Sequence, residues 1–164
     1  SDKLEYEIAG FLSNVSTGSL TEEEAEQVKV LYRVIGELES LGDSGENISR
    51  ILERERVHNR KFDDDSISKI LTLSAKVEKG YDVMVENLKN ATSLEGVKDI
   101  SNAYASEDDI NETRNKLREE GILQIEHHTG NYQSLNYFLD MIAELEAMGD
   151  FMINVSQAIV RNDN

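Results

Sequence analysis

The feature of this 164-residue chain that most constrains its fold is an internal repeat. Residues 35–52 and 142–159 align without gaps at an offset of 107, and eight of their eighteen positions are identical. The identical pairs are Ile35/Ile142, Glu37/Glu144, Leu38/Leu145, Glu39/Glu146, Gly42/Gly149, Asp43/Asp150, Asn47/Asn154 and Ser49/Ser156. Such a repeat predicts that one structural unit occurs twice.

Both copies show the apolar period of an α-helix. At about 100° per residue, the apolar residues of each copy fall on one side of the helix. They are Ile35, Leu38, Leu41, Gly42, Ile48 and Leu52 in the first copy and Ile142, Leu145, Met148, Gly149, Met152, Val155 and Ile159 in the second. A glycine inside a helix costs about 1 kcal/mol relative to alanine. Because this cost occurs at both Gly42 and Gly149, we expect another backbone to approach closely at both.

A second set of repeated residues is polar. Glu39, Asp43 and Asn47 follow one another at intervals of four and form one stripe, which drifts from the edge of the apolar side to the far face. The second copy repeats it with Glu146, Asp150 and Asn154. Solvation alone would also place a polar stripe there. Like charges four residues apart repel mildly, and hard cations relieve such repulsion. The stripe is therefore a solvated or ion-paired surface, or part of a metal site.

Composition favours helices and narrows the range of functions. The chain has no proline and no cysteine, so it has no disulfides and no thiolate metal site. Its net charge of −16 argues against binding nucleic acid or anionic lipid. No apolar run approaches the roughly 18 residues of a membrane span, and no signal peptide is apparent. No glycine-rich phosphate loop, nucleophile–base pair or HExxH motif indicates an enzyme.

Periodicity and capping signals predict helices along the whole chain. The first begins abruptly, so we expect it to continue ahead of Ser1. A capping box at Thr21 and Glu24 opens a long helix, and acidic residues 63–65 favour a helix N-terminus over a metal site. A fresh cap near Thr92 opens a less regular helix through Val97. The expected helices span residues 1–15, 22–59, 66–91, 94–121 and 132–161, with a looser segment at 124–131.

Two histidine patterns are weaker signals. His127 and His128 are adjacent, and neighbours on a helix point about 100° apart, which makes them poor joint ligands. Glu55-x-x-His58 has the spacing of a di-iron ligand pair, but a di-iron bundle needs two such motifs and the chain has one. We interpret both patterns as coincidental.

The repeated motif resembles that of a known family. Glu-Leu-Glu-x-Leu/Met-Gly-Asp-x-x-x-Asn-Ile/Val is similar to the signature of PhoU domains, three-helix bundles that occur in tandem and hold metal clusters through Glu/Asp-x-x-x-Asp motifs. The order of helices and the basic-then-acidic junction at 60–63 extend the resemblance over most of the chain. It is closest to the cytoplasmic C-terminal PhoU-like domain of bacterial sodium/phosphate cotransporter family proteins.

This resemblance implies an all-α fold of two pseudo-repeated three-helix units, packed as antiparallel bundles. Residues 1–60 would form the first unit, truncated at its N-terminus, and residues 61–164 the second, together one compact unit. It also implies a non-enzymatic regulatory domain of a sodium-dependent phosphate transporter, at the cytoplasmic face of the inner membrane. The expected partner is the membrane segment preceding the chain, with a homodimer as an alternative and no nucleic acid. Alternative functions are a stand-alone PhoU regulator of phosphate signalling, a metal-dependent phosphohydrolase-like bundle and a plain helical scaffold.

The resemblance further implies a set of metal ligands. They are Glu39 and Asp43 in the first half and Glu146 and Asp150 in the second, facing Glu107 and Asn111 in the second half and Asp2 in the first. Asparagine at position 111 replaces an expected aspartate, and Ser40, Ala147, Ser44 and Phe151 replace the flanking Arg and His. The implied cofactors are Fe, Mn, Mg or Ca ions, among which oxygen ligands do not discriminate.

Overall fold

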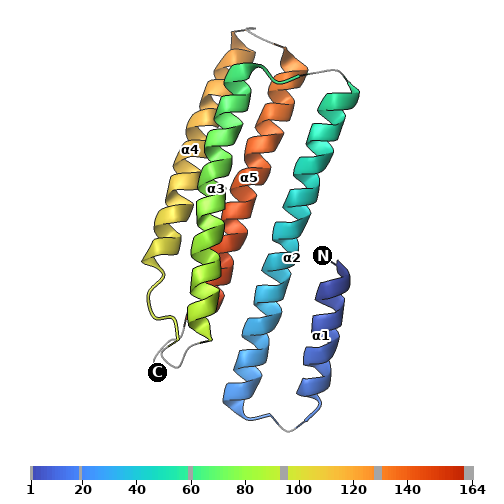
Figure 1. Ribbon diagram of the computed structural model, residues 1–164, viewed down its shortest axis with the longest axis vertical. Helices are drawn as coiled ribbons and strands as arrows, with labels where there is room; N and C mark the ends of the chain where they lie inside the picture. The colour runs from blue at the N-terminus through green and yellow to red at the C-terminus, as the bar shows by residue number, and fades with distance from the viewer. Residues whose placement is uncertain (1, 19, 59–60, 93–95, 128–130, 161–164) are drawn as a thin grey trace.

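The computed structural model describes residues 2–18, 20–58, 61–92, 96–127 and 131–160, and of Asp2 the backbone only. Five helices account for most of them, which confirms the all-α prediction (Figure 1). The helices are α1 (Asp2–Ser16), α2 (Glu22–Val57), α3 (Asp64–Ala91), α4 (Ser101–Glu126) and α5 (Tyr132–Ala158). Within the described ranges, no helix is both long and apolar enough to cross a membrane.

The helices form a three-helix bundle with a helical hairpin packed against it. Helices α3, α4 and α5 contact one another, and the long α2 lies antiparallel to α5 on the side away from α3 and α4 (Figure 1). Helix α1 lies beside the lower half of α2 in that view. Among the described helices, α2 contacts only α1 and α5, and α1 contacts only α2.

Side-chain caps begin three of the helices, and those of α2 and α3 were predicted. The Thr21 hydroxyl accepts from the Glu24 amide at 3.2 Å, and the Glu24 carboxylate accepts from the Thr21 amide at 2.8 Å, which confirms the capping box. The Asp63 carboxylate accepts from the Ser66 amide at 2.7 Å, so this acidic run is a cap as predicted. These bonds from backbone amides lower the pKa of both Glu24 and Asp63, because they stabilise the ionised carboxylate. Asn131 caps α5.

The predicted start of α4 is wrong. The helix begins at Ser101 rather than near residue 94, and Gly96 has a φ of 67°, a left-handed conformation that glycine adopts most readily. Val97 pairs with Val160 in an isolated parallel β-bridge, and its side chain is buried. The apolar pattern that predicted a helix from residue 94 included Val97 and Ile100. Both residues are buried, but in a small cluster with Ala103 and Ile153 and ahead of the first residue of α4.

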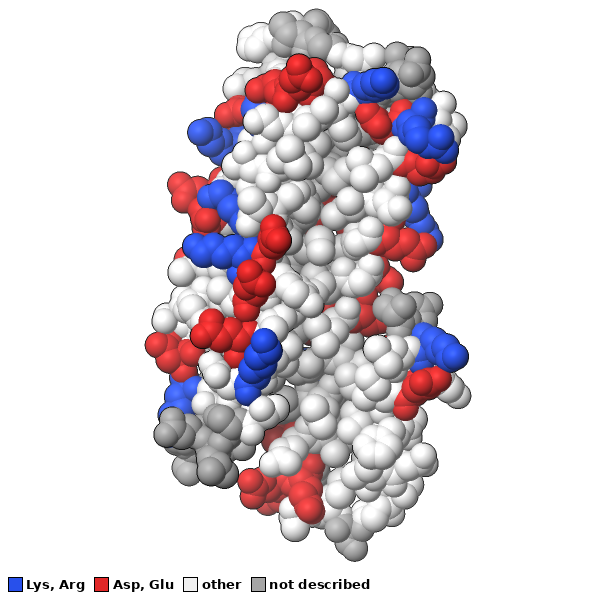
Figure 2. Space-filling model, in the orientation of Figure 1, with Lys and Arg blue, Asp and Glu red and all other residues white. Residues whose placement is uncertain are grey.

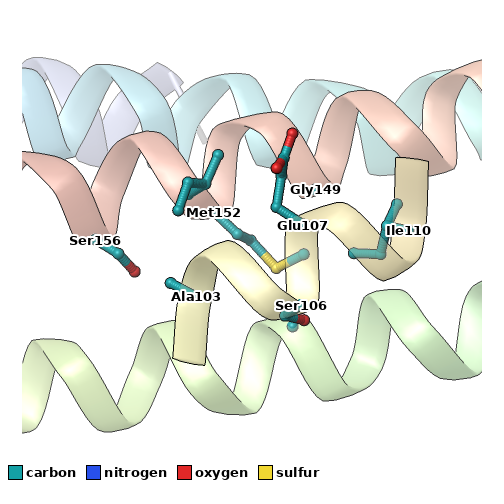
Figure 3. Close-up of a pocket in the computed structure, with 9 residues that line it drawn as sticks. Ala103, Ser106, Glu107, Ile110, Gly149, Met152 and Ser156 are labelled. Carbon is teal, nitrogen blue, oxygen red and sulfur yellow. The ribbon is translucent and has the colours of Figure 1, made fainter. Parts of the chain in front are cut away.

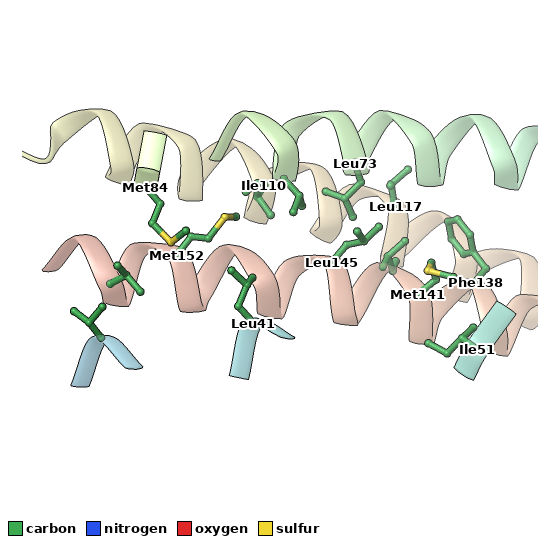
Figure 4. Packing of buried hydrophobic residues seen from close by; sticks show 14 of the residues in the cluster. Leu41, Ile51, Leu73, Met84, Ile110, Leu117, Phe138, Met141, Leu145 and Met152 are labelled. Atoms are coloured by element: carbon green, nitrogen blue, oxygen red, sulfur yellow. The ribbon is translucent and has the colours of Figure 1, made fainter. Parts of the chain in front are cut away.

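The main core lies around α5. Figure 4 shows α5 between α3 and α4 on one side and α2 on the other, with Leu73, Met84, Ile110 and Leu117 meeting Phe138, Leu145 and Met152. Leu41 and Ile51 of α2 are buried in the same core. Burying a residue of this size contributes about 1.5–3 kcal/mol, and α5 has buried residues along most of its length, from Leu135 to Ala158.

The predicted apolar side is therefore buried unequally in the two copies. On α5 the prediction is confirmed for Ile142, Leu145, Met152 and Val155, which are all buried. On α2 it is confirmed for Leu41 but wrong for Leu38 and Leu52, which are 38% and 47% exposed. The physical reason is that α5 is covered by three helices, whereas α2 is covered by α5 and, over part of its length, by α1.

The two repeated glycines differ in the same way. A Cβ on Gly149 would lie 3.2 Å from both Cδ1 and Cγ2 of Ile110, so the glycine makes room for a side chain of α4. Gly42 is exposed. At Gly149 a side chain approaches rather than the expected backbone, and at Gly42 the expected close approach stays a prediction.

Candidate functional site

The repeated polar residues join the two copies through reciprocal hydrogen bonds. The amide of Asn47 on α2 donates to the carboxylate of Glu144 on α5, with Nδ2 and Oε1 3.2 Å apart. The amide of Asn154 on α5 donates to the carboxylate of Glu37 on α2, with Nδ2 and Oε2 3.0 Å apart. Because Asn47 is the repeat equivalent of Asn154, and Glu37 of Glu144, each bond is the counterpart of the other.

This reciprocity gives the α2–α5 pair pseudo-twofold symmetry. Glu37 and Asn47 each lie five residues from Gly42, and Glu144 and Asn154 each lie five residues from Gly149. The local axis therefore crosses the antiparallel pair at the level of the two repeated glycines. A twofold contact of this kind uses the same patch on both partners, as in a symmetric dimer. The chain thus contains an isologous interface between its own two halves.

The reciprocal bonds correct the interpretation of the polar stripe. We expected Asn47 and Asn154 to reach the far face, but both are half-buried between α2 and α5. Their partners Glu37 and Glu144 were absent from the candidate set. Both are among the eight identities, and that was the signal available for finding them.

In the second half, the motif glutamates contact neighbouring polar side chains. Glu146 forms an ion pair with Arg114 of α4, and the two side chains are only 18% and 24% exposed. The Glu107 carboxylate accepts a hydrogen bond from the Asn111 amide one turn further along α4. Arg114 is thus the cation that neutralises Glu146. Arg114 lies seven residues after Glu107 and three after Asn111, so the three side chains share one face of α4. This spacing is visible in the sequence and could have indicated Arg114.

Two polar atoms of this group have no hydrogen-bond partner among the described residues. They are Oδ1 of Asn111 and Nε of Arg114, and both are buried. Close by, Glu107 and Ser106 line a small space with Ile110, Gly149 and Met152 (Figure 3). Its volume is about 10 Å³, which is about the minimum for one water molecule. A small-molecule substrate therefore has no room there.

The remaining predicted metal ligands are Asp43, Asp150, Glu39 and Asp2. Asp43 and Asp150 are exposed, and Glu39 is half-buried. The side chain of Asp2 lies outside the described residues. Across the described ranges, no three His, Asp or Glu side chains gather closely enough to hold a metal ion. Binding of Fe, Mn, Mg or Ca at these residues stays a prediction.

The histidine patterns lie elsewhere. His58 Nδ1 is 2.8 Å from the hydroxyl of Tyr137, and the two rings are stacked with an interplanar angle of 7°. Glu55 accepts a hydrogen bond from the Phe62 amide at 2.9 Å, and this bond links the last turns of α2 to Phe62. His127 is exposed at the end of α4, and His128 lies outside the described residues.

Comparisons of the chain with family models, with curated proteins and with solved structures found no match.

Proposed function

We propose that this chain is a PhoU-like regulatory domain that acts through contacts with a partner rather than through catalysis, and that the process it regulates is sodium-dependent phosphate uptake. The observation that carries the proposal is the reciprocal Asn–Glu bonding between the two copies of the motif. A tandem pair of PhoU-like units requires that two copies of one helical unit pack together, and these bonds supply that contact from motif residues.

The contacts of the motif glutamates with neighbouring side chains favour a regulatory function over hydrolysis. A metal-dependent hydrolase needs carboxylates that converge on a metal-bound water. Here Glu146 is paired with Arg114, and Glu107 accepts from Asn111. The most accessible motif carboxylates are Asp43 and Asp150, which are on different helices and both exposed. Exposed, repeated carboxylates suit recognition of a basic partner surface or of cations.

The test is sodium-dependent uptake of radiolabelled phosphate by cells that express the full native polypeptide. The Asp43→Ala/Asp150→Ala variant is expected to change how uptake responds to phosphate supply, at equal protein abundance. Asp82→Ala, an exposed aspartate of α3 outside the motif, is the matched control. An unchanged response in the double variant would refute regulation through the motif.

Two alternatives give different results. A stand-alone PhoU regulator would change expression of phosphate-responsive genes without any transporter in the same polypeptide. A phosphohydrolase-like bundle would release phosphate from p-nitrophenyl phosphate with Mn²⁺ or Mg²⁺, and the activity would be lost in Asp43→Ala and Asp150→Ala.

A further inference from the structure

One face of α2 is exposed although its counterpart on α5 is covered. We call this face the α2 seam. It consists of Leu31, Leu38, Gly42, Gly45, Ser49 and Leu52. Its repeat equivalents on α5 are Phe138, Leu145, Gly149, Met152, Ser156 and Ile159. Leu31, Leu38, Gly45 and Leu52 recur every seven residues, so they lie along one line of the helix.

The exposures of the two faces differ widely. Leu31 is 48% exposed and Leu38 38%, whereas Phe138 is 3% and Leu145 5% exposed. Ser49 is exposed, whereas Ser156 is fully buried. A Cβ on Gly45 would meet nothing within 4 Å. Aligned, exposed apolar side chains of this kind mark interaction surfaces.

The second half shows what covers this face when it is complete. Ile110 of α4 fits against Gly149. The Asn87 amide of α3 donates to the Ser156 hydroxyl at 3.3 Å, and Gly80 of α3 lies against Met152. The occupants are therefore two amphipathic helices: α4 places an aliphatic side chain at the glycine, and α3 places an amide at the serine. The seam has the same glycine and serine, Gly42 and Ser49.

Among the described residues, α1 covers part of α2 and leaves Leu31, Leu38 and Leu52 of the seam exposed. Helix α1 packs beside α2, where the Tyr32 hydroxyl donates to the Ala9 carbonyl at 2.9 Å. Helix α1 itself exposes Leu4 and Phe11, at 64% and 66%. In Figure 2 the lower right of the molecule, where α1 lies in Figure 1, carries few charged side chains.

The net charge of the chain favours a different protein over a second copy of the chain as the occupant of the α2 seam. Each copy has a net charge of −16, so two copies repel each other as they approach. A helix with net positive charge would be attracted to the same surface.

We propose that the α2 seam is the docking site for an amphipathic, net basic helix of a partner protein, which packs on α2 as α3 and α4 pack on α5. The partner helix would place an amide near Ser49, as α3 places Asn87 at Ser156. This inference goes beyond the proposed function, since it holds whether or not phosphate uptake is the regulated process.

The test uses a labelled synthetic peptide of residues 64–91 as the probe, because α3 is the chain's own example of the occupant. Fluorescence anisotropy with the chain of residues 1–164 should show saturable binding. Changing the exposed Asp64, Asp65 and Glu78 of the peptide to Lys should tighten binding at low salt, and added salt should reduce the gain. Absence of binding by both peptides would overturn the proposal.

Two substitutions in the protein locate the binding. Leu38→Glu should weaken binding about tenfold or more, because it places a charge in the seam. Leu123→Glu on α4, 51% exposed, is the matched control and should leave binding unchanged. Equal affinity in Leu38→Glu and Leu123→Glu would overturn the proposal, since the peptide would then bind elsewhere.

A single introduced cysteine distinguishes the proposed occupant of the seam from the alternative occupants. The chain has none, so Leu38→Cys offers one thiol whose rate of alkylation reports cover of the seam. The peptide should protect it. Protection that rises with protein concentration would assign the seam to a second copy, and protection by phosphatidylcholine vesicles would assign it to a lipid surface. Protection in the full native polypeptide alone would assign it to another segment of that polypeptide. Each of these three results overturns the proposal, and none depends on phosphate uptake.

Discussion

The same substitution at the two repeated glycines should have opposite effects on stability. Both are helix-interior positions, so alanine gains about 0.5–1 kcal/mol of helix propensity at each. Gly42 is exposed, so this gain is expected there. At Gly149 the new methyl would lie 3.2 Å from two carbons of Ile110. Ile110 is 1% exposed, so it has little freedom to move away.

The size of the difference follows from the contact. Overpacking a close-packed core costs about 1–3 kcal/mol. Gly42→Ala should therefore raise the free energy of unfolding by about 0.5–1 kcal/mol, and Gly149→Ala should lower it by up to about 2 kcal/mol. The propensity gain cancels in the comparison, so the two variants should differ by about 1–3 kcal/mol. For a chain of this size the midpoints would differ by about 2–12 °C.

The assay is urea and thermal unfolding followed by circular dichroism at 222 nm. Ile110→Val provides a rescue, because it removes Cδ1, one of the two crowded carbons. Alone it should cost about 0.5–1.5 kcal/mol, and less in the Gly149→Ala background, with a coupling of about 0.5 kcal/mol or more. If both glycine variants shifted stability in the same direction by the same amount, the asymmetric packing of the two copies would be refuted.

Three further predictions concern the polar groups. Asn154→Ala should lower the free energy of unfolding by about 1–2 kcal/mol, and a double-mutant cycle with Glu37→Ala should show coupling of similar size; zero coupling would contradict the reciprocal bonds. The amide of Ser66 lowers the pKa of Asp63, so this cap stabilises the fold above its unfolded pKa, near 3.8, and the contribution is lost as pH falls through the folded pKa. Asp63→Ala should thus cost about 1 kcal/mol at neutral pH and progressively less in acid unfolding series below about pH 4. Arg114→Gln should raise the affinity for Mn²⁺ in titration calorimetry, because it removes the cation paired with Glu146, and equal affinities would contradict a metal site shared with that carboxylate.

Local signals predicted the helices well. Caps such as Thr21 and Asp63 act on amides two or three residues away, so their effect can be worked out from a few neighbouring residues. The start of α4 was not predictable in this way. Val97 is buried by pairing with Val160, which is 63 residues further along the chain. Burial of that kind depends on tertiary contacts.

The candidate site was predictable in its residues but not in its pairings. The repeat identified Glu146, Asn47 and Asn154 as special positions. Whether Glu146 would meet a metal or an arginine depends on which face α4 turns toward α5, and periodicity does not fix that rotation. The structure places Arg114 of α4 beside Glu146. Likewise, only the antiparallel register of α2 and α5 brings Asn47 to Glu144.

The identities between the two copies bear on the uncovered seam. Four of the eight identical pairs, Ile35/Ile142, Leu38/Leu145, Gly42/Gly149 and Ser49/Ser156, lie on the face that α3 and α4 cover on α5. Two more pairs form the reciprocal Asn–Glu bonds. The remaining two pairs, Glu39/Glu146 and Asp43/Asp150, belong to the polar stripe, and Asp43 and Asp150 are exposed. Solvent exposure does not select leucine on a helix surface, where charged residues keep a protein dispersed. The apolar identities at the seam therefore favour packing on both copies, in keeping with the proposal that a helix covers α2 as well.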